Sequence, residues 1–229
     1  MREVLEAVRQ SIEQAALGSG RRSEEITLVA VSKFATLEQV YQAIACGQMD
    51  FGENRADKLL EKTAVISDSV RWHFIGQLQT NKVKYIIDKV SMVQSLDRLS
   101  LAKELDKRAA KAGRVVPALL EVRLNDNPER GGVPPEEVEP LLEQCASFAH
   151  LRVQGLMCVA PLGCDAKTTE DCFERVRSLF EHLKTRCPDN ASMQVLSMGM
   201  SHDYVAAIRH GATMVRIGSA IFAPQQGKS

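Results

Sequence analysis

Short apolar runs alternate along the chain with segments that are apolar on one side only. A short apolar run bounded by polar or glycine residues is typical of a strand buried on both faces. We predict eight such strands, at 26–31, 49–52, 71–75, 90–93, 115–124, 151–159, 193–196 and 213–217. The first is followed by Ser32-Lys33, which places a lysine where a buried strand reaches the surface.

The segments between the strands have the period of amphipathic helices. We predict helices at 2–17, 36–47, 54–66, 82–87, 97–113 and 201–210, the second opened by the capping box Thr36-x-x-Gln39. Asp97 is expected to cap the helix that follows it. Two further helices are predicted. Pro140 is expected in the first turn of one, where its missing N–H costs little, and Thr168 or Thr169 is expected to start the other.

This alternation of strand and helix predicts a parallel sheet covered by helices. Eight units favour an α/β fold of the (β/α)8 TIM-barrel type, with an extra helix in front. An open doubly wound sheet is the alternative that the pattern leaves open. Because there is no linker, internal repeat or low-complexity segment, we expect residues 1–229 to form one domain.

Charge and cysteine content narrow the class of protein. The chain has 29 Lys and Arg against 29 Asp and Glu, so a net charge of zero gives no electrostatic argument for nucleic acid or an anionic membrane. No run resembles a signal peptide or could span a bilayer. The six cysteines form no C-x-x-C pair and no cluster with histidines, so we expect free thiols in a cytoplasmic protein and no metal site.

If the fold is a barrel, its site lies at the carboxyl ends of the strands. Most of the residues at these ends are polar or glycine, in contrast to the apolar strands before them. They are Lys33, Glu53-Asn54, Gly76-Gln77, Asn125, Met157, Ser197–Ser201 and Arg216–Ser219.

Two of these ends suit phosphate binding. In Ser197–Ser201, Gly199 permits close approach of the backbone, Ser201 can donate its hydroxyl, and the start of a helix offers free N–H groups. Gly218 and Ser219 add further N–H donors after strand eight, and barrels often bind phosphate with the loops after strands seven and eight. The alternative is that Ser201 only caps its helix, and Asp203 would compete for the same helix end.

Lys33 is either a solvated loop residue or the site of covalent chemistry. A lysine that attacks a carbonyl must be neutral, and partial burial beside Arg216 would favour that form. A Schiff base on Lys33 opposite a phosphate site predicts an aldehyde cofactor that carries a phosphate, namely pyridoxal 5′-phosphate (PLP).

Six ordered motifs, which span nearly the whole chain, resemble the pyridoxal phosphate homeostasis protein family. These proteins are single-domain relatives of the barrel half of bacterial alanine racemase. The motifs are Val31-Ser32-Lys33, Phe51-Gly52-Glu53-Asn54-Arg55, residues 72–82, Gly155-Leu156-Met157, residues 196–204 and residues 216–222. The resemblance implies a fold-type III barrel with the cofactor on Lys33.

By the same resemblance, the cofactor-binding residues are those that hold the phosphate, face the pyridine nitrogen or line the pocket. They are Ser201, Gly218 and Ser219 for the phosphate, Arg216 for the nitrogen, and Asn54 and Met198 for the pocket. The chain departs from the family pattern twice, with Arg130-Gly131-Gly132 where Lys-x-Gly is common and Ala223 where glycine is usual. The first departure leaves the role of the loop 125–135 open.

Three other residues in these motifs have ordinary structural interpretations. Trp72 is expected in the core, and His73 either faces the pocket or is a satisfied structural histidine. Met157 is expected to pack at the barrel mouth.

Three functions remain open. The resemblance implies a carrier or regulator in vitamin B6 and amino-acid homeostasis, which passes PLP to apo-enzymes. We expect a monomer, because no long exposed apolar helix demands a partner. A low-activity amino-acid racemase is the enzymatic alternative, although Arg216 cannot protonate the pyridine nitrogen and the tyrosines at 41, 85 and 204 supply no convincing second base. The third is a Schiff-base aldolase for a sugar phosphate, without a cofactor.

Overall fold

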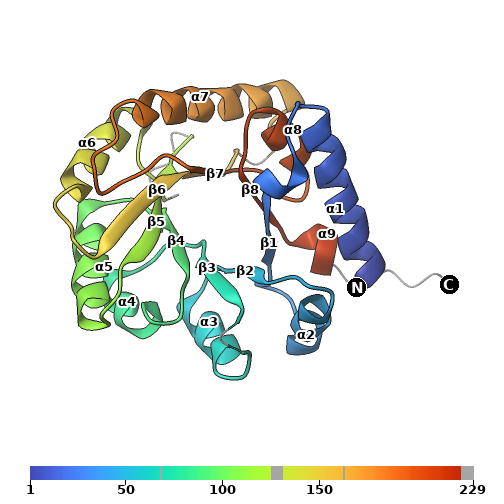
Figure 1. The fold of residues 1–229 in the computed structure, drawn as a ribbon, viewed down its shortest axis with the longest axis horizontal. Helices are drawn as coiled ribbons and strands as arrows, with labels where there is room; N and C mark the ends of the chain where they lie inside the picture. The colour runs from blue at the N-terminus through green and yellow to red at the C-terminus, as the bar shows by residue number, and fades with distance from the viewer. Residues whose placement is uncertain (68, 125–130, 162, 223–229) are drawn as a thin grey trace.

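Eight parallel strands close into a barrel in the order of the sequence, β1 to β8 (Figure 1). The computed structural model describes residues 1–67, 69–124, 131–161 and 163–222. The strands are β1 (Thr27–Val31), β2 (Asp50–Glu53), β3 (Arg71–Phe74), β4 (Met92–Leu96), β5 (Val116–Val122), β6 (Leu151–Cys158), β7 (Val195–Ser197) and β8 (Met214–Ile217). The expected TIM-type fold is confirmed, and the open sheet is wrong because β1 pairs with β8.

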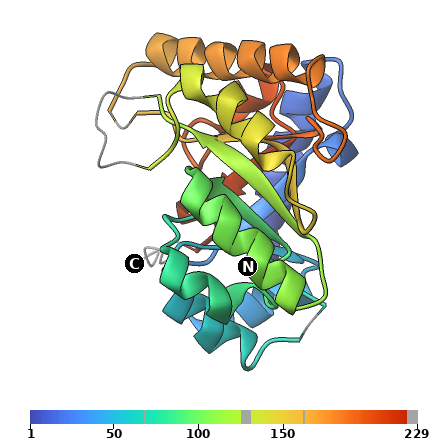
Figure 2. The same cartoon turned by 90° about the vertical axis from the view of Figure 1, so that its left-hand side faces the viewer.

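Helices form the outer layer of the barrel, as the side view over α5 and α6 shows (Figure 2). They are α1 (Arg2–Leu17), α2 (Leu37–Ala45), α3 (Ala56–Thr63), α4 (Thr80–Ile86), α5 (Leu99–Lys111), α6 (Pro135–Cys145), α7 (Ala166–Lys184), α8 (Tyr204–Arg209) and α9 (Ser219–Phe222), with the 3-10 turn η1 (Ser23–Glu25). The extra helix α1 packs against α8 and α9. Thr36 caps α2 through the predicted capping box.

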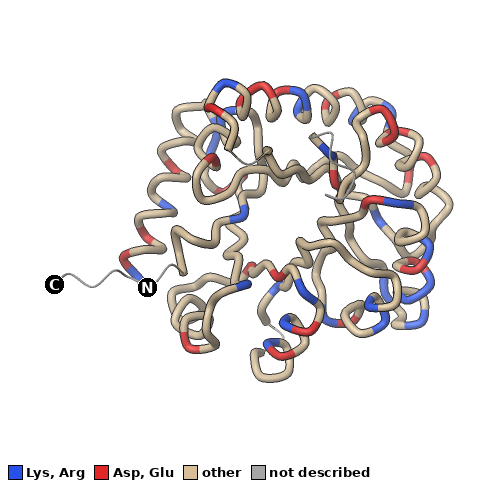
Figure 3. The backbone as a smooth tube through the Cα atoms, turned by 180° about the vertical axis from the view of Figure 1, so that it is seen from behind, with Lys and Arg blue, Asp and Glu red and all other residues tan. Residues whose placement is uncertain are grey.

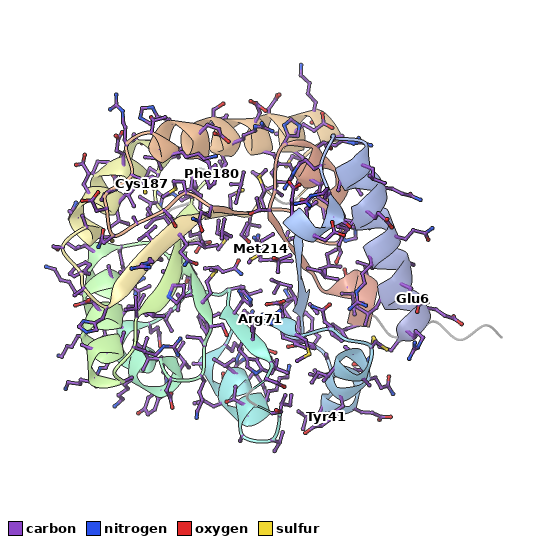
Figure 4. All side chains as sticks on the ribbon, viewed as in Figure 1. Glu6, Tyr41, Arg71, Phe180, Cys187 and Met214 are labelled. Carbon is purple, nitrogen blue, oxygen red and sulfur yellow. The ribbon has the colours of Figure 1, made fainter. Side chains whose placement is uncertain are left out.

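The barrel has two apolar regions. A large cluster lies between strands and helices and contains fully buried side chains such as Phe51, Phe74 and Phe173. A smaller cluster inside the barrel contains Val29, Met92, Leu119, Met157 and Met214. Figure 4 places Met214 within the ring of strands and Phe180 in the helical layer.

The fourth strand extends further than its apolar run predicts. It was predicted to end at Val93 but reaches Leu96. The added residues include Gln94 and Ser95, which are polar and nevertheless fully buried. The predicted cap at Asp97 is wrong. Arg98 is the cap residue of α5, and the Asp97 carboxylate instead accepts a hydrogen bond from the Arg98 guanidinium.

Three predicted helix starts are also wrong. Helix α6 begins at Pro135, so Pro140 lies inside the helix and not in its first turn. Helix α7 begins at Ala166 because the Asp165 side chain caps it by accepting from the Thr168 N–H. Helix α8 begins at Tyr204, three residues after the predicted start at Ser201.

The remaining general expectations concern membranes, thiols and metals. Within the described ranges, no helix combines the length and the apolar character needed to cross a membrane. All six cysteines are free thiols. In the same part of the chain, no three His, Cys, Asp or Glu side chains come together as ligands for a metal ion.

Candidate functional site

The predicted phosphate-binding residues come together at the carboxyl ends of β7 and β8. Ser201 Oγ accepts hydrogen bonds from the Gly218 N–H at 3.2 Å and the Ala220 N–H at 3.3 Å. Ser201 therefore joins the loop after β7 to the segment after β8, and it is not a helix cap. The expected free N–H at this helix start is wrong for Met200, whose N–H donates to the Asp203 carboxylate at 2.5 Å.

Two glycines lie at tight points of this site. Gly199 has φ +94°, and a Cβ there would lie 2.6 Å from the Ala207 Cβ. At Gly218 a Cβ would lie 3.2 Å from the Val31 Cβ, so the segment after β8 runs close against the end of β1. Because β1 and β8 are neighbours, Lys33 follows β1 on the same side of the barrel as the Ser201 hydroxyl.

Lys33 lies in an exposed turn directly after β1. Its Nζ lies 5.1 Å from the centre of the Phe34 ring, and Phe34 is itself 86% exposed. The expected partial burial of Lys33 beside Arg216 is wrong, because the Arg216 side chain is buried in the barrel while Lys33 reaches solvent.

A buried ion pair supports the turn that carries Lys33. The residue before it, Ser32, is fully buried, and its carbonyl accepts from Lys62 Nζ at 2.6 Å. Lys62 also pairs with the fully buried carboxylate of Glu53. Sequence reasoning missed Lys62, because a lysine on a helix that is polar overall gives no signal of burial.

Arg216 lies inside the barrel and is only 4% exposed. Its Nη1 donates to Ser197 Oγ at 2.6 Å and its Nη2 to the Cys158 carbonyl at 2.7 Å. Burial lowers the pKa of this guanidinium, which the charge of Glu121 partly opposes. Most other charged positions lie on the outer ring of helices and loops (Figure 3).

Polar side chains continue from Ser197 across the barrel interior. Ser197 Oγ donates to Gln94 Oε1 at 2.7 Å, and Gln94 Nε2 lies 3.0 Å from His73 Nδ1. His73 Nε2 lies 3.1 Å from the Asp50 carboxylate, which accepts from Arg71 at 2.6 and 2.7 Å. The structural interpretation of His73 is confirmed, since both ring nitrogens have partners.

The Asp50 carboxylate is the last member of this series of hydrogen bonds. Burial raises its pKa, but the hydrogen bonds from His73 and Arg71 outweigh that effect and hold the pKa below its usual value. Sequence reasoning missed Asp50 because it lies within the predicted strand 49–52, where its partners on other strands give no local signal. It missed Gln94 because the fourth strand was predicted to end at Val93.

Glu121 lies near the carboxyl end of β5, at the opposite end of the barrel from Asp50. Burial and the nearby charge of Asp97 raise its pKa to about 7, against the opposing effect of Arg216. A Cβ at Gly131 would lie 3.4 Å from Glu121 Oε2, so this carboxyl lies under the described end of the loop after β5. Because Glu121 lies inside the apolar run 115–124, the sequence gave no sign of a carboxyl with a raised pKa at this position.

The other predicted residues differ in exposure. Asn54 is exposed after β2, whereas Met198 is fully buried and packs in the cluster between strands and helices. Trp72 is 2% exposed and packs against Phe51, which confirms its core position. Met157 packs inside the barrel. Asn125, Arg130 and Ala223 lie outside the described residues.

Comparisons with known proteins agree with the fold. The family model for the alanine racemase N-terminal domain matches residues 5–226. A pyridoxal phosphate homeostasis protein from Aquifex aeolicus is 38% identical over 221 residues, which cover 96% of each chain. The structure of PipY from Synechococcus elongatus without PLP is 32% identical with a TM-score of 0.88, and covers 97% of this chain and 100% of that one. PipY with PLP bound gives a TM-score of 0.82 at 32% identity, over 93% and 99% of the two chains.

Proposed function

The chain belongs to the alanine racemase N-terminal domain family, among its pyridoxal phosphate homeostasis proteins, and on that premise we propose that it binds PLP and acts in the homeostasis of this cofactor. It holds PLP as a Schiff base on Lys33 and acts as a carrier or regulator. One domain, residues 1–229, does this as a monomer, in the cytoplasm, with PLP-dependent apo-enzymes as recipients.

The adjacency of β1 and β8 carries this proposal. It brings Val31, two residues before Lys33, against Gly218, which in turn donates to the hydroxyl of Ser201. An amine and hydrogen-bond donors for a phosphate can therefore serve one ligand at the same face of the barrel. The exposed position of Lys33 suits an amine that must meet a carbonyl arriving from solvent.

The residues present can meet the phosphate, the carbonyl and the pyridine nitrogen of the cofactor. Ser201, Gly218 and Ser219 hold the phosphate, and Asn54 borders the pocket. The Met198 side chain does not line it, because it packs in the cluster between strands and helices. Arg216 donates toward the pyridine nitrogen and leaves it without a proton, because a guanidinium does not give its proton up. PLP supplies an electron sink when bound, and a nitrogen without a proton weakens that sink.

The tyrosines support a carrier more than a racemase, the alternative function. A racemase needs a second base facing Lys33 across the bound substrate. Tyr204 Oη donates to Ser11 Oγ on α1 at 2.8 Å, and Tyr41 Oη donates to the Val65 carbonyl at 2.8 Å. These contacts direct both hydroxyl groups to the helical layer.

The test is the absorption spectrum of the purified protein with PLP, before and after borohydride reduction. We expect a Schiff-base band that reduction removes, and a phosphopyridoxyl group on the peptide that contains Lys33. Lys33→Ala loses both signals. Lys58→Ala, a change at an exposed lysine of α3, keeps them. A protein that added PLP does not colour would overturn the proposal.

The same preparation separates carrier from racemase. We expect no robust conversion of L-alanine or L-serine to the D-enantiomer in chiral analysis. Transfer of PLP to a PLP-dependent apo-enzyme is expected to restore its activity. Robust racemisation that disappears in Lys33→Ala would replace the carrier with the racemase.

A further inference from the structure

A series of buried hydrogen bonds crosses the barrel from Arg216 on β8 to Asp50 on β2. The series, called here the barrel chain, consists of Arg216, Ser197, Gln94, His73 and Asp50. Its members come from five different strands, and the five residues are between 0% and 9% exposed. Ser197, Gln94, His73 and Asp50 are not among the residues proposed to bind the phosphate. Lys33, the proposed cofactor lysine, is not a member of the barrel chain.

The donors and acceptors of the barrel chain follow one direction. A guanidinium only donates, so Ser197 Oγ accepts from Arg216 and its own hydrogen goes to Gln94 Oε1. The Gln94 amide must then present Nε2 to His73, which makes Nδ1 an acceptor. The single proton of a neutral His73 ring therefore lies on Nε2 and is donated to the Asp50 carboxylate.

The reversed direction fails at both ends. If the Gln94 amide were turned over, the Ser197 hydroxyl hydrogen would lose its acceptor, Gln94 Oε1, and Gln94 Nε2 would leave Met214 Sδ, which lies 3.1 Å away. A neutral His73 ring would also turn its unprotonated Nε2 toward a carboxylate, so two acceptors would oppose each other. One arrangement thus satisfies every member of the barrel chain.

Arg216 needs this support because its charge is buried. Both hydrogen bonds that the structure gives its guanidinium go to neutral acceptors, the Ser197 hydroxyl and the Cys158 carbonyl. A buried charge requires compensation, and oriented dipoles supply it when no carboxylate is in contact. The barrel chain aligns such dipoles from Arg216 to Asp50.

We propose that Ser197, Gln94 and His73 are positioning residues that orient the Arg216 guanidinium toward the bound cofactor, with Asp50 as the anionic end of the barrel chain. The inference rests on the proposed function, in which Arg216 faces the pyridine nitrogen. The electronic state of the ring is then set partly by residues on the far side of the barrel. Asp50 and Arg71 line a cavity of about 590 Å³ there, at the amino ends of β1 to β3.

The first test uses the protein without PLP. Nitrogen-15 spectra of the His73 ring are expected to show the Nε2-protonated form, with Nδ1 as a hydrogen-bond acceptor. Gln94→Leu is expected to shift the Nδ1 resonance by removing its donor. A wild-type ring that carries its proton on Nδ1 alone would overturn the inference, whether or not the protein binds PLP.

The second test uses the protein loaded with PLP labelled with nitrogen-15 in its ring. Ser197→Ala and Gln94→Leu are each expected to shift the pyridine resonance and to weaken PLP binding by roughly tenfold. The double variant is expected to resemble Ser197→Ala alone, because one break already disconnects the barrel chain. Additive losses, or an unchanged pyridine resonance in a folded variant, would overturn the inference.

Ser95→Ala is the matched control. Ser95 neighbours Gln94 on β4 and is equally buried, but its hydroxyl has no hydrogen-bond partner in the described chain. The change is expected to leave the pyridine resonance and the PLP affinity as in the wild type. An equal shift in Ser95→Ala would reduce the effect to general loosening of the barrel and would contradict the inference. A wild type with the expected His73 ring but no PLP band would defeat the proposed function alone.

Discussion

Lys62 Nζ donates a hydrogen bond of 2.6 Å to the main-chain carbonyl of Ser32, the residue that immediately precedes Lys33. The same ammonium pairs with Glu53, whose second carboxylate oxygen has no partner among the described residues. An ion pair on the outer side of the sheet thus anchors the strand end from which Lys33 emerges. This relationship gives Lys33, the lysine proposed to hold the cofactor, a rigid base although its own side chain is exposed.

Lys62→Met is expected to lower the free energy of unfolding by about 3–5 kcal/mol, because it leaves the Glu53 carboxylate buried without its partner. Urea unfolding measures the loss. Glu53→Gln added to Lys62→Met is expected to recover part of it, since the carboxylate charge is then gone. Lys58→Met breaks an exposed pair with Glu61 and is expected to cost less than about 1 kcal/mol. Equal losses for both lysines would contradict this account.

Ser201→Ala is expected to weaken PLP binding by roughly tenfold, because it removes a hydroxyl that the phosphate would contact and that now fixes the Gly218 and Ala220 N–H groups. Titration of the absorbance band with PLP measures the affinity. Ser178→Ala, at an exposed position of α7, serves as the control and is expected to change nothing. If pyridoxal without the phosphate loses as much affinity as PLP does, the hydroxyl does not act on the phosphate.

Glu121→Gln is expected to flatten the dependence of stability on pH. The folded-state pKa is raised from 4.5 to about 7, so the folded protein holds a proton that the unfolded chain has lost in this range. Stability therefore falls as pH rises from 4.5 to about 7, by on the order of 3 kcal/mol, and the deficit persists above that range. Removing the charge is expected to raise the Tm at pH 8 more than at pH 5.

Glu143→Gln provides the control for this pH experiment, because Glu143 is an exposed carboxyl on α6. Thermal unfolding of the three proteins at several pH values is the measurement. Parallel curves for wild type and Glu121→Gln would show that burial does not set the titration of Glu121.

The strand order and the site segments could be predicted from the sequence because their signals are local. An apolar run ends at Val31, a lysine follows, and Gly218-Ser219 follows the last run. Closure of the barrel brings these segments together, so their places at strand ends were sufficient to expect contact. The capping box at Thr36 was equally local and is confirmed.

The polar residues of the barrel interior could not be predicted in this way. Gln94 and Ser95 look like the end of a strand, since a polar residue normally marks the surface. Their burial depends on partners distant in sequence, such as His73 and Ser197 for Gln94. The same holds for Lys62, whose partners lie on β2 and at the end of β1.

Tyr204→Phe distinguishes a structural tyrosine from a catalytic base. Its hydroxyl joins α8 to α1 through Ser11, so we expect a loss of about 1 kcal/mol in the free energy of unfolding. Ser11→Ala is expected to cost a similar amount, and the double variant little more, because both single changes remove the same hydrogen bond. PLP affinity and the Schiff-base band are expected to stay as in the wild type.

The same variant bears on the choice between carrier and racemase. If Tyr204 were the second base, any conversion of L-alanine in the wild type would disappear in Tyr204→Phe while Ser11→Ala kept it. The hydrogen bond to Ser11 predicts instead that trace conversion, where chiral analysis detects any, is the same in wild type and Tyr204→Phe. Such conversion would then come from Lys33 and solvent, as expected of a barrel that holds its cofactor for delivery.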